Sequence, residues 1–127
     1  MTMRLLLDTH IFLWIADDSS RLNSKARELV DSASEVFVSS ATIWEVAVKA
    51  RIGKMIVDPD ELLLEIDKCG FQELLVSGRH AVGVARLPLI HNDPFDRLLV
   101  AQGISEKMHL LTADARLAEY SELVIVI

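Results

Sequence analysis

Short apolar runs alternate along this chain with longer segments that have the spacing of amphipathic helices. The first two apolar runs, 3–7 and 35–39, are followed by helical patterns over 9–16 and 40–51. Strands separated by helical segments are typical of βαβ units, in which the strands lie parallel and helices cover both faces of the sheet. The alternation therefore predicts an α/β fold with a mainly parallel central sheet.

The remaining elements are marked by capping signals and by further apolar runs. Asp58-Pro59 and Asp93-Pro94 each place a capping aspartate before a proline that fits the first helical position. These signals and the apolar periodicity predict helices over 23–32, 59–70, 80–86, 94–105 and 115–120, and strands over 71–76, 109–112 and 123–127.

Length and cysteine content limit the class of protein further. The 127 residues, 51% of them hydrophobic, can bury about two-thirds of the unfolded surface in one core, which predicts a single domain over 1–127. The one cysteine, Cys69, excludes a disulfide framework and a Cys-rich zinc site, and we interpret it as a core residue.

Hydropathy and charge bear on location and partners. The apolar run 5–7 ends at Asp8, which is too short for a signal-peptide core, and no stretch approaches the roughly 20 apolar residues of a membrane span. We therefore expect a cytoplasmic protein without a membrane partner. The formal net charge of −6 argues against binding nucleic acid through an overall positive charge. Carboxylates that hold a metal ion can still bind phosphate groups.

Two aspartates lie at or just past the ends of predicted strands. Asp8 comes after the first strand and Asp114 comes two residues after Thr112, which ends the 109–112 strand. Ligand sites of parallel sheets form beyond the carboxyl ends of the strands, so both positions fit a site. Both also fit helix caps or turns, and Thr112 is either an ordinary strand residue or a hydroxyl donor to a phosphate or water.

Two further acids lie on predicted helices. Glu45 is crowded by apolar neighbours, yet taken alone it is best interpreted as a surface pair with Lys49 at i,i+4. Asp96 lies in the first turn after Pro94, where it either offsets the helix dipole or reaches into a cleft. The neighbouring Arg97 is a candidate partner for a carboxylate or a phosphate.

Taken together, these acids predict a metal site. A parallel sheet brings strand ends to one edge, and three or four carboxylates cannot stay ionised close together without cations between them. Oxygen ligands select hard ions such as Mg²⁺ or Mn²⁺. The phosphate-binding, zinc-protease and serine-hydrolase motifs are missing, and the four histidines (His10, His80, His91 and His109) are scattered, which argues against a zinc site.

Four segments resemble, in order, the successive motifs of PIN-domain proteins. They are 5–10, 40–49, 91–102 and 111–114, and the likeness is strongest to the VapC-type toxins of type II toxin–antitoxin pairs. The resemblance covers essentially the whole chain and implies a three-layer α/β/α sandwich. It also implies an endoribonuclease that hydrolyses RNA phosphodiester bonds with a metal-activated water and acts as a toxin.

The resemblance assigns roles to individual residues by position. Asp8, Glu45 and Asp96 match the metal-binding acids of the family, and Asp114 matches its more variable fourth acid, whereas Asp93 is better explained as a helix cap. We accordingly expect catalytic and metal-binding roles for Asp8, Glu45, Asp96 and Asp114, with Mg²⁺ or Mn²⁺ as the cofactor.

The resemblance also implies an RNA substrate, a cognate antitoxin and a homodimer. The helices that carry Trp14 and Trp44 are candidate contact surfaces, although either tryptophan is more often a core residue. Side chains that could contact RNA, or simply be solvated, are Lys49, Arg51, Lys54, Arg86 and Arg97.

Two alternatives remain open. A non-catalytic PIN-like interaction module would keep the fold without the activity. A phosphoacceptor signalling domain has a similar length and an aspartate at a strand end, but it would need further acids beside the first strand and a lysine after a late strand.

Overall fold

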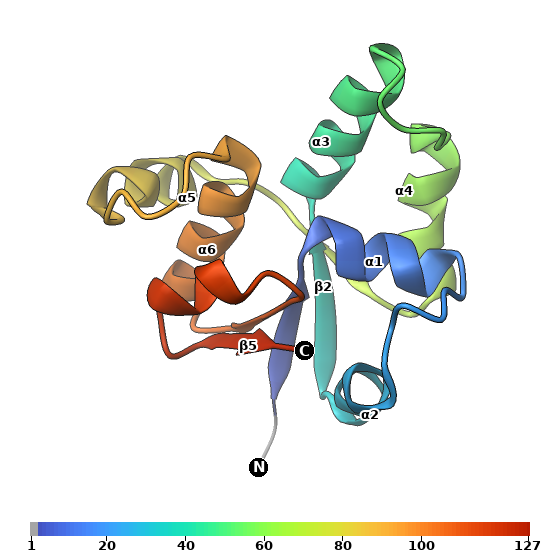
Figure 1. Ribbon diagram of the computed structural model, residues 1–127, viewed down its shortest axis with the longest axis horizontal. Helices are drawn as coiled ribbons and strands as arrows, with labels where there is room; N and C mark the ends of the chain where they lie inside the picture. The colour runs from blue at the N-terminus through green and yellow to red at the C-terminus, as the bar shows by residue number, and fades with distance from the viewer. Residues whose placement is uncertain (1–2) are drawn as a thin grey trace.

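The computed structural model describes residues 3–127, and a sheet of five parallel strands forms its centre (Figure 1). The spatial order is β3-β2-β1-β4-β5, so the first strand lies in the middle. This confirms the predicted parallel sheet. The strands are β1 (Arg4–Leu7), β2 (Glu35–Ser39), β3 (Gln72–Leu74), β4 (His109–Thr112) and β5 (Val124–Val126).

Helices cover both faces of this sheet. The α-helices are α1 (Thr9–Ala16), α2 (Ser24–Ser32), α3 (Ser40–Arg51), α4 (Pro59–Lys68), α5 (Gly78–Gly83) and α6 (Pro94–Glu106), and two 3₁₀ helices are η1 (Val84–Arg86) and η2 (Ala115–Glu119). Figure 1 shows α1, α2 and α4 on one side of the strands and α5 and α6 on the other.

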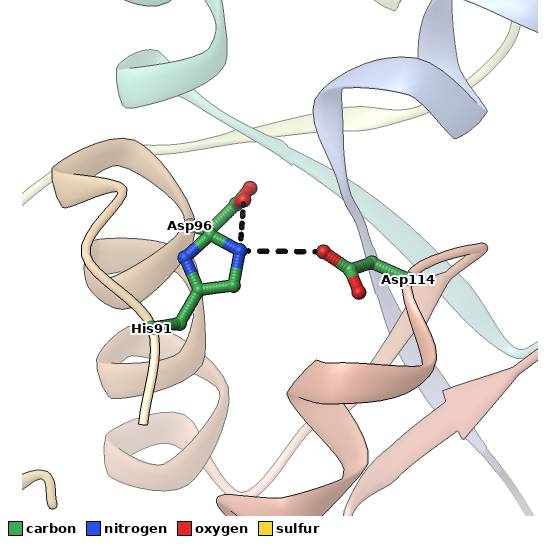
Figure 2. Close-up of side chains that lie close together, drawn as sticks. All are labelled: His91, Asp96 and Asp114. Atoms are coloured by element: carbon green, nitrogen blue, oxygen red, sulfur yellow. Dashed lines mark hydrogen bonds and ion pairs between the residues drawn. The ribbon is translucent and has the colours of Figure 1, made fainter. Parts of the chain in front are cut away.

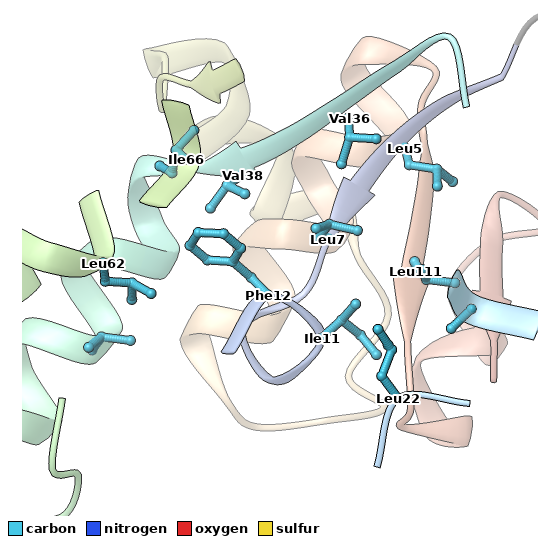
Figure 3. Packing of buried hydrophobic residues seen from close by; sticks show 12 residues of the cluster. Leu5, Leu7, Ile11, Phe12, Leu22, Val36, Val38, Leu62, Ile66 and Leu111 are labelled. Atoms are coloured by element: carbon cyan, nitrogen blue, oxygen red, sulfur yellow. The ribbon is translucent and has the colours of Figure 1, made fainter. Parts of the chain in front are cut away.

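The alternation of side chains along β1 divides the core into two clusters. Leu5 and Leu7 pack with Phe12 of α1 and with residues of α2, α3 and α4 (Figure 3). Leu6, between them, points to the opposite face and packs with Leu99 of α6. All three leucines are fully buried, which explains why this strand reads as an uninterrupted apolar run. The predicted three-layer α/β/α arrangement is therefore confirmed.

The structure shortens one predicted strand. The 71–76 segment forms a strand only over Gln72–Leu74, because its partner β2 ends at Ser39, which pairs with Leu74. Beyond that pair the chain turns away, and Leu75 and Val76 are exposed. The predicted helix over 80–86 is divided into α5, which begins earlier at Gly78, and the 3₁₀ turn η1.

Cys69 is not a core residue, so that interpretation is wrong. It follows the last turn of α4, is only partly buried, and its Sγ lies 3.7 Å from Glu65 Oε1. The apolar side of α4 faces the core through Leu62 and Ile66 instead.

None of the helices within residues 3–127 has both the length and the apolar character needed to cross a membrane.

Candidate active site

The four acids predicted from the sequence gather beyond the carboxyl ends of β1, β2 and β4. Asp8 follows β1 directly, Asp114 lies just past β4, and Glu45 and Asp96 come from the N-terminal halves of α3 and α6. A cavity of about 480 Å³ opens here; the charged and histidine side chains in its wall are Asp8, His10, His91, Asp93, Asp96, Asp114 and Arg116. Glu45 lies behind this wall, close enough for its charge to raise the pKa of Asp96.

Asp8 is both a helix cap and a buried acid. Its Oδ1 accepts the backbone N–H of Ile11 at 2.9 Å, and its Oδ2 accepts a hydrogen bond from the Thr112 hydroxyl. The side chain is 5% exposed, and this burial raises the pKa of Asp8 above its usual range. Asp8 therefore caps α1 and also lies in the candidate site, two roles that the sequence left as alternatives.

Glu45 is buried rather than solvated. Its Oε1 accepts a hydrogen bond from the Thr9 hydroxyl at 2.6 Å, and its Oε2 forms an ion pair with Lys49 Nζ, also at 2.6 Å. The hydrogen bond to Glu45 raises the pKa of Lys49. The expected i,i+4 partner is confirmed, but the interpretation as a surface pair is wrong because Glu45 is only 3% exposed.

Asp96 has the most unusual electrostatic environment of the four acids. Partial burial raises its pKa to about 7, with additional repulsion from Asp93, Asp8, Glu45 and Asp114. Asp93 accepts the backbone N–H groups of Phe95 and Asp96, which confirms it as the cap of α6. The cap fixes the first turn of this helix, so Asp96 is held among the other carboxylates.

Asp114 lies on the exposed side of the cavity. Its carboxylate accepts hydrogen bonds from Arg116 Nε at 3.1 Å and Nη2 at 2.9 Å, and these contacts hold the pKa of Asp114 at about 2. Its backbone N–H donates to Thr112 Oγ1 at 3.0 Å. Thr112 therefore connects Asp8 to Asp114 and is more than an ordinary strand residue.

His91 also lies among these acids, although the sequence patterns did not predict it there. Its Nε2 lies 3.3 Å from Asp114 Oδ2 and 3.6 Å from Asp96 Oδ2 (Figure 2). One ligand atom from each of these three residues falls within a span of 4.8 Å. The local spacing of His91 and Asp93 was a usable signal, but the contact with Asp114 crosses 23 positions of sequence and requires the fold.

The candidate role of Arg97 as a partner for a carboxylate or phosphate is not supported by its contacts, which are with backbone carbonyl groups, including that of His91 at 3.5 Å, and with a tyrosine hydroxyl. Its guanidinium donates to the carbonyl oxygens of Pro88 at 2.9 Å and Val84 at 3.2 Å, and to the Tyr120 hydroxyl at 3.2 Å. These contacts tie α6 to η1 and to the loop that precedes His91.

The two tryptophans differ from each other in exposure. Trp44 is 58% exposed and packs edge-to-face against Phe95 with ring centroids 4.9 Å apart. Trp14 is partly buried and lines the cavity of the acids. Trp44 is therefore a surface residue beside the site rather than a core residue.

The donors of this site suit a hard divalent cation. Carboxylates from four segments lie near one another: burial raises the pKa of Asp96 most, and repulsion from Asp93, Asp8, Glu45 and Asp114 raises it further. Such a set of oxygen ligands fits Mg²⁺ or Mn²⁺ rather than a thiophilic metal. Asp8, Glu45, Asp96 and Asp114 are the residues that could hold the ion.

The chain matches the model of a known protein family. The PIN domain family model matches residues 5–123, and the chain is therefore a member of the PIN domain family. This confirms the resemblance drawn from the sequence motifs.

Relatives within and near this family support the same classification. The chain is 26% identical to "Ribonuclease VapC22" of Mycobacterium tuberculosis (strain ATCC 25618 / H37Rv) over 124 residues, which cover 91% of this chain and 90% of the relative. VapBC2 from Rickettsia felis, solved with a DNA fragment from its promoter, matches with a TM-score of 0.69, 16% identity and 98% coverage of both chains. A toxin–antitoxin complex from Klebsiella pneumoniae matches with a TM-score of 0.68, 16% identity and 96% coverage of both chains. At such identities the solved structures establish the fold.

Proposed function

We propose that this chain is a metal-dependent endoribonuclease and the toxin of a toxin–antitoxin pair. The observation that carries the proposal is that Asp8, Asp96 and Asp114 line one cavity with Glu45 close behind, where repulsion between carboxylates adds to burial in raising the pKa of Asp96 to about 7. Membership in the PIN domain family and the relative named a ribonuclease support RNA hydrolysis over other metal chemistry.

In this proposal the four acids hold one or two Mg²⁺ or Mn²⁺ ions. A bound ion would lower the pKa of water and offset the charge of a phosphodiester. The chain contributes the fixed positions of the ligands: Thr112 and the Ile11 N–H orient Asp8, and Thr9 orients Glu45. Fixed carboxylates favour metal binding because little conformational freedom is lost when the ion arrives.

The proposed partners are RNA in the cytoplasm, a cognate antitoxin and a second copy of the chain. Several solved structures with this fold are toxin–antitoxin complexes, which supports an antitoxin partner. Exposed apolar side chains on α3 and the turn after it offer surface for a protein contact: Trp44, Val48, Ile52 and Ile56.

The test is cleavage of a panel of structured RNAs by the purified chain with Mg²⁺ or Mn²⁺. We expect internal cleavage that a chelator abolishes, and its loss in Asp8→Asn with the fold retained. Asp67→Asn, which changes an exposed aspartate on α4, is the matched control and should cleave normally.

Other outcomes of the same assay contradict the proposal in different ways. Cleavage that survives Asp8→Asn would place the activity elsewhere, and a folded wild-type chain that cleaves none of the RNAs would favour the interaction module. Labelling of Asp8 by a small phosphodonor would favour the phosphoacceptor alternative.

A further inference from the structure

His91 is held in a fixed position at the edge of the candidate site. Its side chain is 7% exposed, and its backbone N–H donates to the Tyr120 hydroxyl at 2.8 Å. The ring lies between Asp96 of α6 and Asp114 of the loop after β4 (Figure 2). A buried ring with so little freedom can set the positions of the carboxylates that it touches.

The contacts of the two ring nitrogens determine what the imidazole offers to the site. The backbone N–H of Asp93 points at Nδ1 with an N···N distance of 3.0 Å, so Nδ1 accepts a hydrogen bond. In a neutral imidazole, a nitrogen that accepts leaves the other nitrogen to carry the proton. Nε2 is therefore an N–H donor, and it faces Asp114 Oδ2 at 3.3 Å and Asp96 Oδ2 at 3.6 Å.

The same short segment positions Asp96 as well. The backbone N–H of Asp93 holds His91, while the Asp93 carboxylate accepts the N–H groups of Phe95 and Asp96 at the start of α6. Pro94 occupies the first turn of the helix, where no backbone donor is needed. The turn thus fixes the imidazole and the Asp96 carboxylate relative to each other.

Arg116 and His91 both hold the Asp114 carboxylate. Arg116 Nε and Nη2 donate to the two carboxylate oxygens at 3.1 and 2.9 Å, and the arginine side chain is 66% exposed. His91 Nε2 lies 3.3 Å from Asp114 Oδ2, and its side chain is buried. Of the two contacts, only the one from His91 also faces Asp96.

We propose that His91 is a positioning residue of this site: its Nε2–H orients the Asp114 carboxylate beside Asp96, and the ring does not ligate the metal. This inference rests on the proposed metal-dependent function. The rival role is direct ligation through Nε2, which the clustering of His91, Asp96 and Asp114 also allows but which the bond from Asp93 to Nδ1 opposes. Ligation would require the proton to move from Nε2 to Nδ1, and the ring would then lose the hydrogen bond from the Asp93 N–H.

The test measures Mn²⁺ binding by the whole chain, using calorimetry for affinity and electron spin-echo spectroscopy for nitrogen coupling to the ion. We expect His91→Phe, which keeps a ring but removes the donor, to lower the affinity at least tenfold, the scale typical of residues that orient metal ligands. His91→Gln, which restores an N–H donor, should recover most of that loss. His109→Gln, at the start of β4, is the matched control and should bind as the wild type does.

Two readouts on the wild type need no variant and so hold even where His91→Phe fails to fold. Nitrogen-15 NMR of the metal-free chain should show His91 protonated at Nε2 and bare at Nδ1. Bound Mn²⁺ should show no coupling to an imidazole nitrogen.

The outcomes separate this inference from the function on which it rests. Imidazole coupling to Mn²⁺ that is present in the wild type and lost in His91→Phe, a proton on Nδ1 instead of Nε2, or unchanged affinity in a folded His91→Phe would overturn the positioning role alone. A wild-type chain that binds no Mn²⁺ would overturn the proposed function and the role of His91 together.

Discussion

The four acids of the site form two pairs with contrasting surroundings. The inner pair, Asp8 and Glu45, is at most 5% exposed, and each carboxylate has partners on both oxygens. The outer pair, Asp96 and Asp114, has side chains 23% and 28% exposed and depends on His91, Arg116 and the loops after η1 and β4. The inner pair is buried among the sheet and its helices, whereas the outer pair is partly open to solvent and includes Asp96, whose pKa is raised to about 7.

Loss of one negative charge from the inner pair should reduce RNA cleavage more than the same loss from the outer pair. Glu45→Gln keeps an oxygen to accept the Thr9 hydroxyl but removes the negative charge behind the cavity. We expect RNA cleavage to fall at least a hundredfold, about 2.7 kcal/mol in transition-state stabilisation. Single-turnover cleavage rates measure this, with Glu28→Gln on the exposed face of α2 as the control.

In the metal-free chain, the Lys49 ammonium should offset part of the carboxylate charge that a bound ion would otherwise neutralise. Lys49→Met leaves the buried Glu45 carboxylate without its cation, so we expect a loss of about 2 kcal/mol in unfolding free energy. Mg²⁺ should restore more stability to this variant than to the wild type, because the ion supplies the missing charge. Urea unfolding with and without Mg²⁺ measures both effects, with Lys25→Met as the control. Equal stabilisation by Mg²⁺ in the variant and the wild type would show that Lys49 and the ion do not compensate the same charge.

Asp96 of the outer pair should make the stability of the chain depend on pH up to about 7. Its pKa is about 7 in the folded chain against 3.8 as the ordinary value, so between these limits the folded state holds a proton that the unfolded state has lost. Asp96 therefore lowers the unfolding free energy as pH rises from about 4 to about 7, and its contribution is constant above that.

Asp96→Asn should remove this dependence. In metal-free protein at pH 8 we expect the variant to be more stable than the wild type by on the order of 1–2 kcal/mol, after discounting for the partial exposure of the side chain. Urea unfolding at pH 5 and pH 8 gives the difference directly. A difference in unfolding free energy between Asp96→Asn and the wild type that stays constant with pH would contradict the raised pKa of Asp96.

The smallest effect should come from Asp114. It is partly exposed and already neutralised by Arg116, so at metal concentrations that saturate the variant Asp114→Asn should slow RNA cleavage only about fivefold, roughly 1 kcal/mol. The rate is measured under the same conditions as for Glu45→Gln. A loss as large as that of Glu45→Gln would remove the distinction between the two pairs.

Much of the inner pair could be predicted from the sequence because its signals are local. Asp8 ends an apolar strand, and a parallel sheet places such an end at a ligand-binding edge. The burial of Glu45 could not be predicted from its own helix, because its second partner, Thr9, comes from 36 positions away.

The surroundings of the outer pair were harder to predict for the same reason. Asp93-Pro94 located the start of α6 and hence Asp96, but His91 meets Asp114 only through tertiary folding. The spacing beside Asp96 suggested a role for Arg97, yet the carbonyl groups of Pro88 and Val84 bind it instead. Sequence patterns predicted the acids themselves, and the fold determined what holds each of them.

The central claim is that both pairs of acids hold one metal centre. Anomalous diffraction from crystals soaked in Mn²⁺ at pH 8, above the pKa of Asp96, tests it most directly. We predict a manganese peak in the cavity, bound by carboxylate oxygens from the inner and outer pairs and lost in crystals of Asp8→Asn. A fully soaked crystal with no peak there, or with manganese only on acids elsewhere on the surface, would contradict the account.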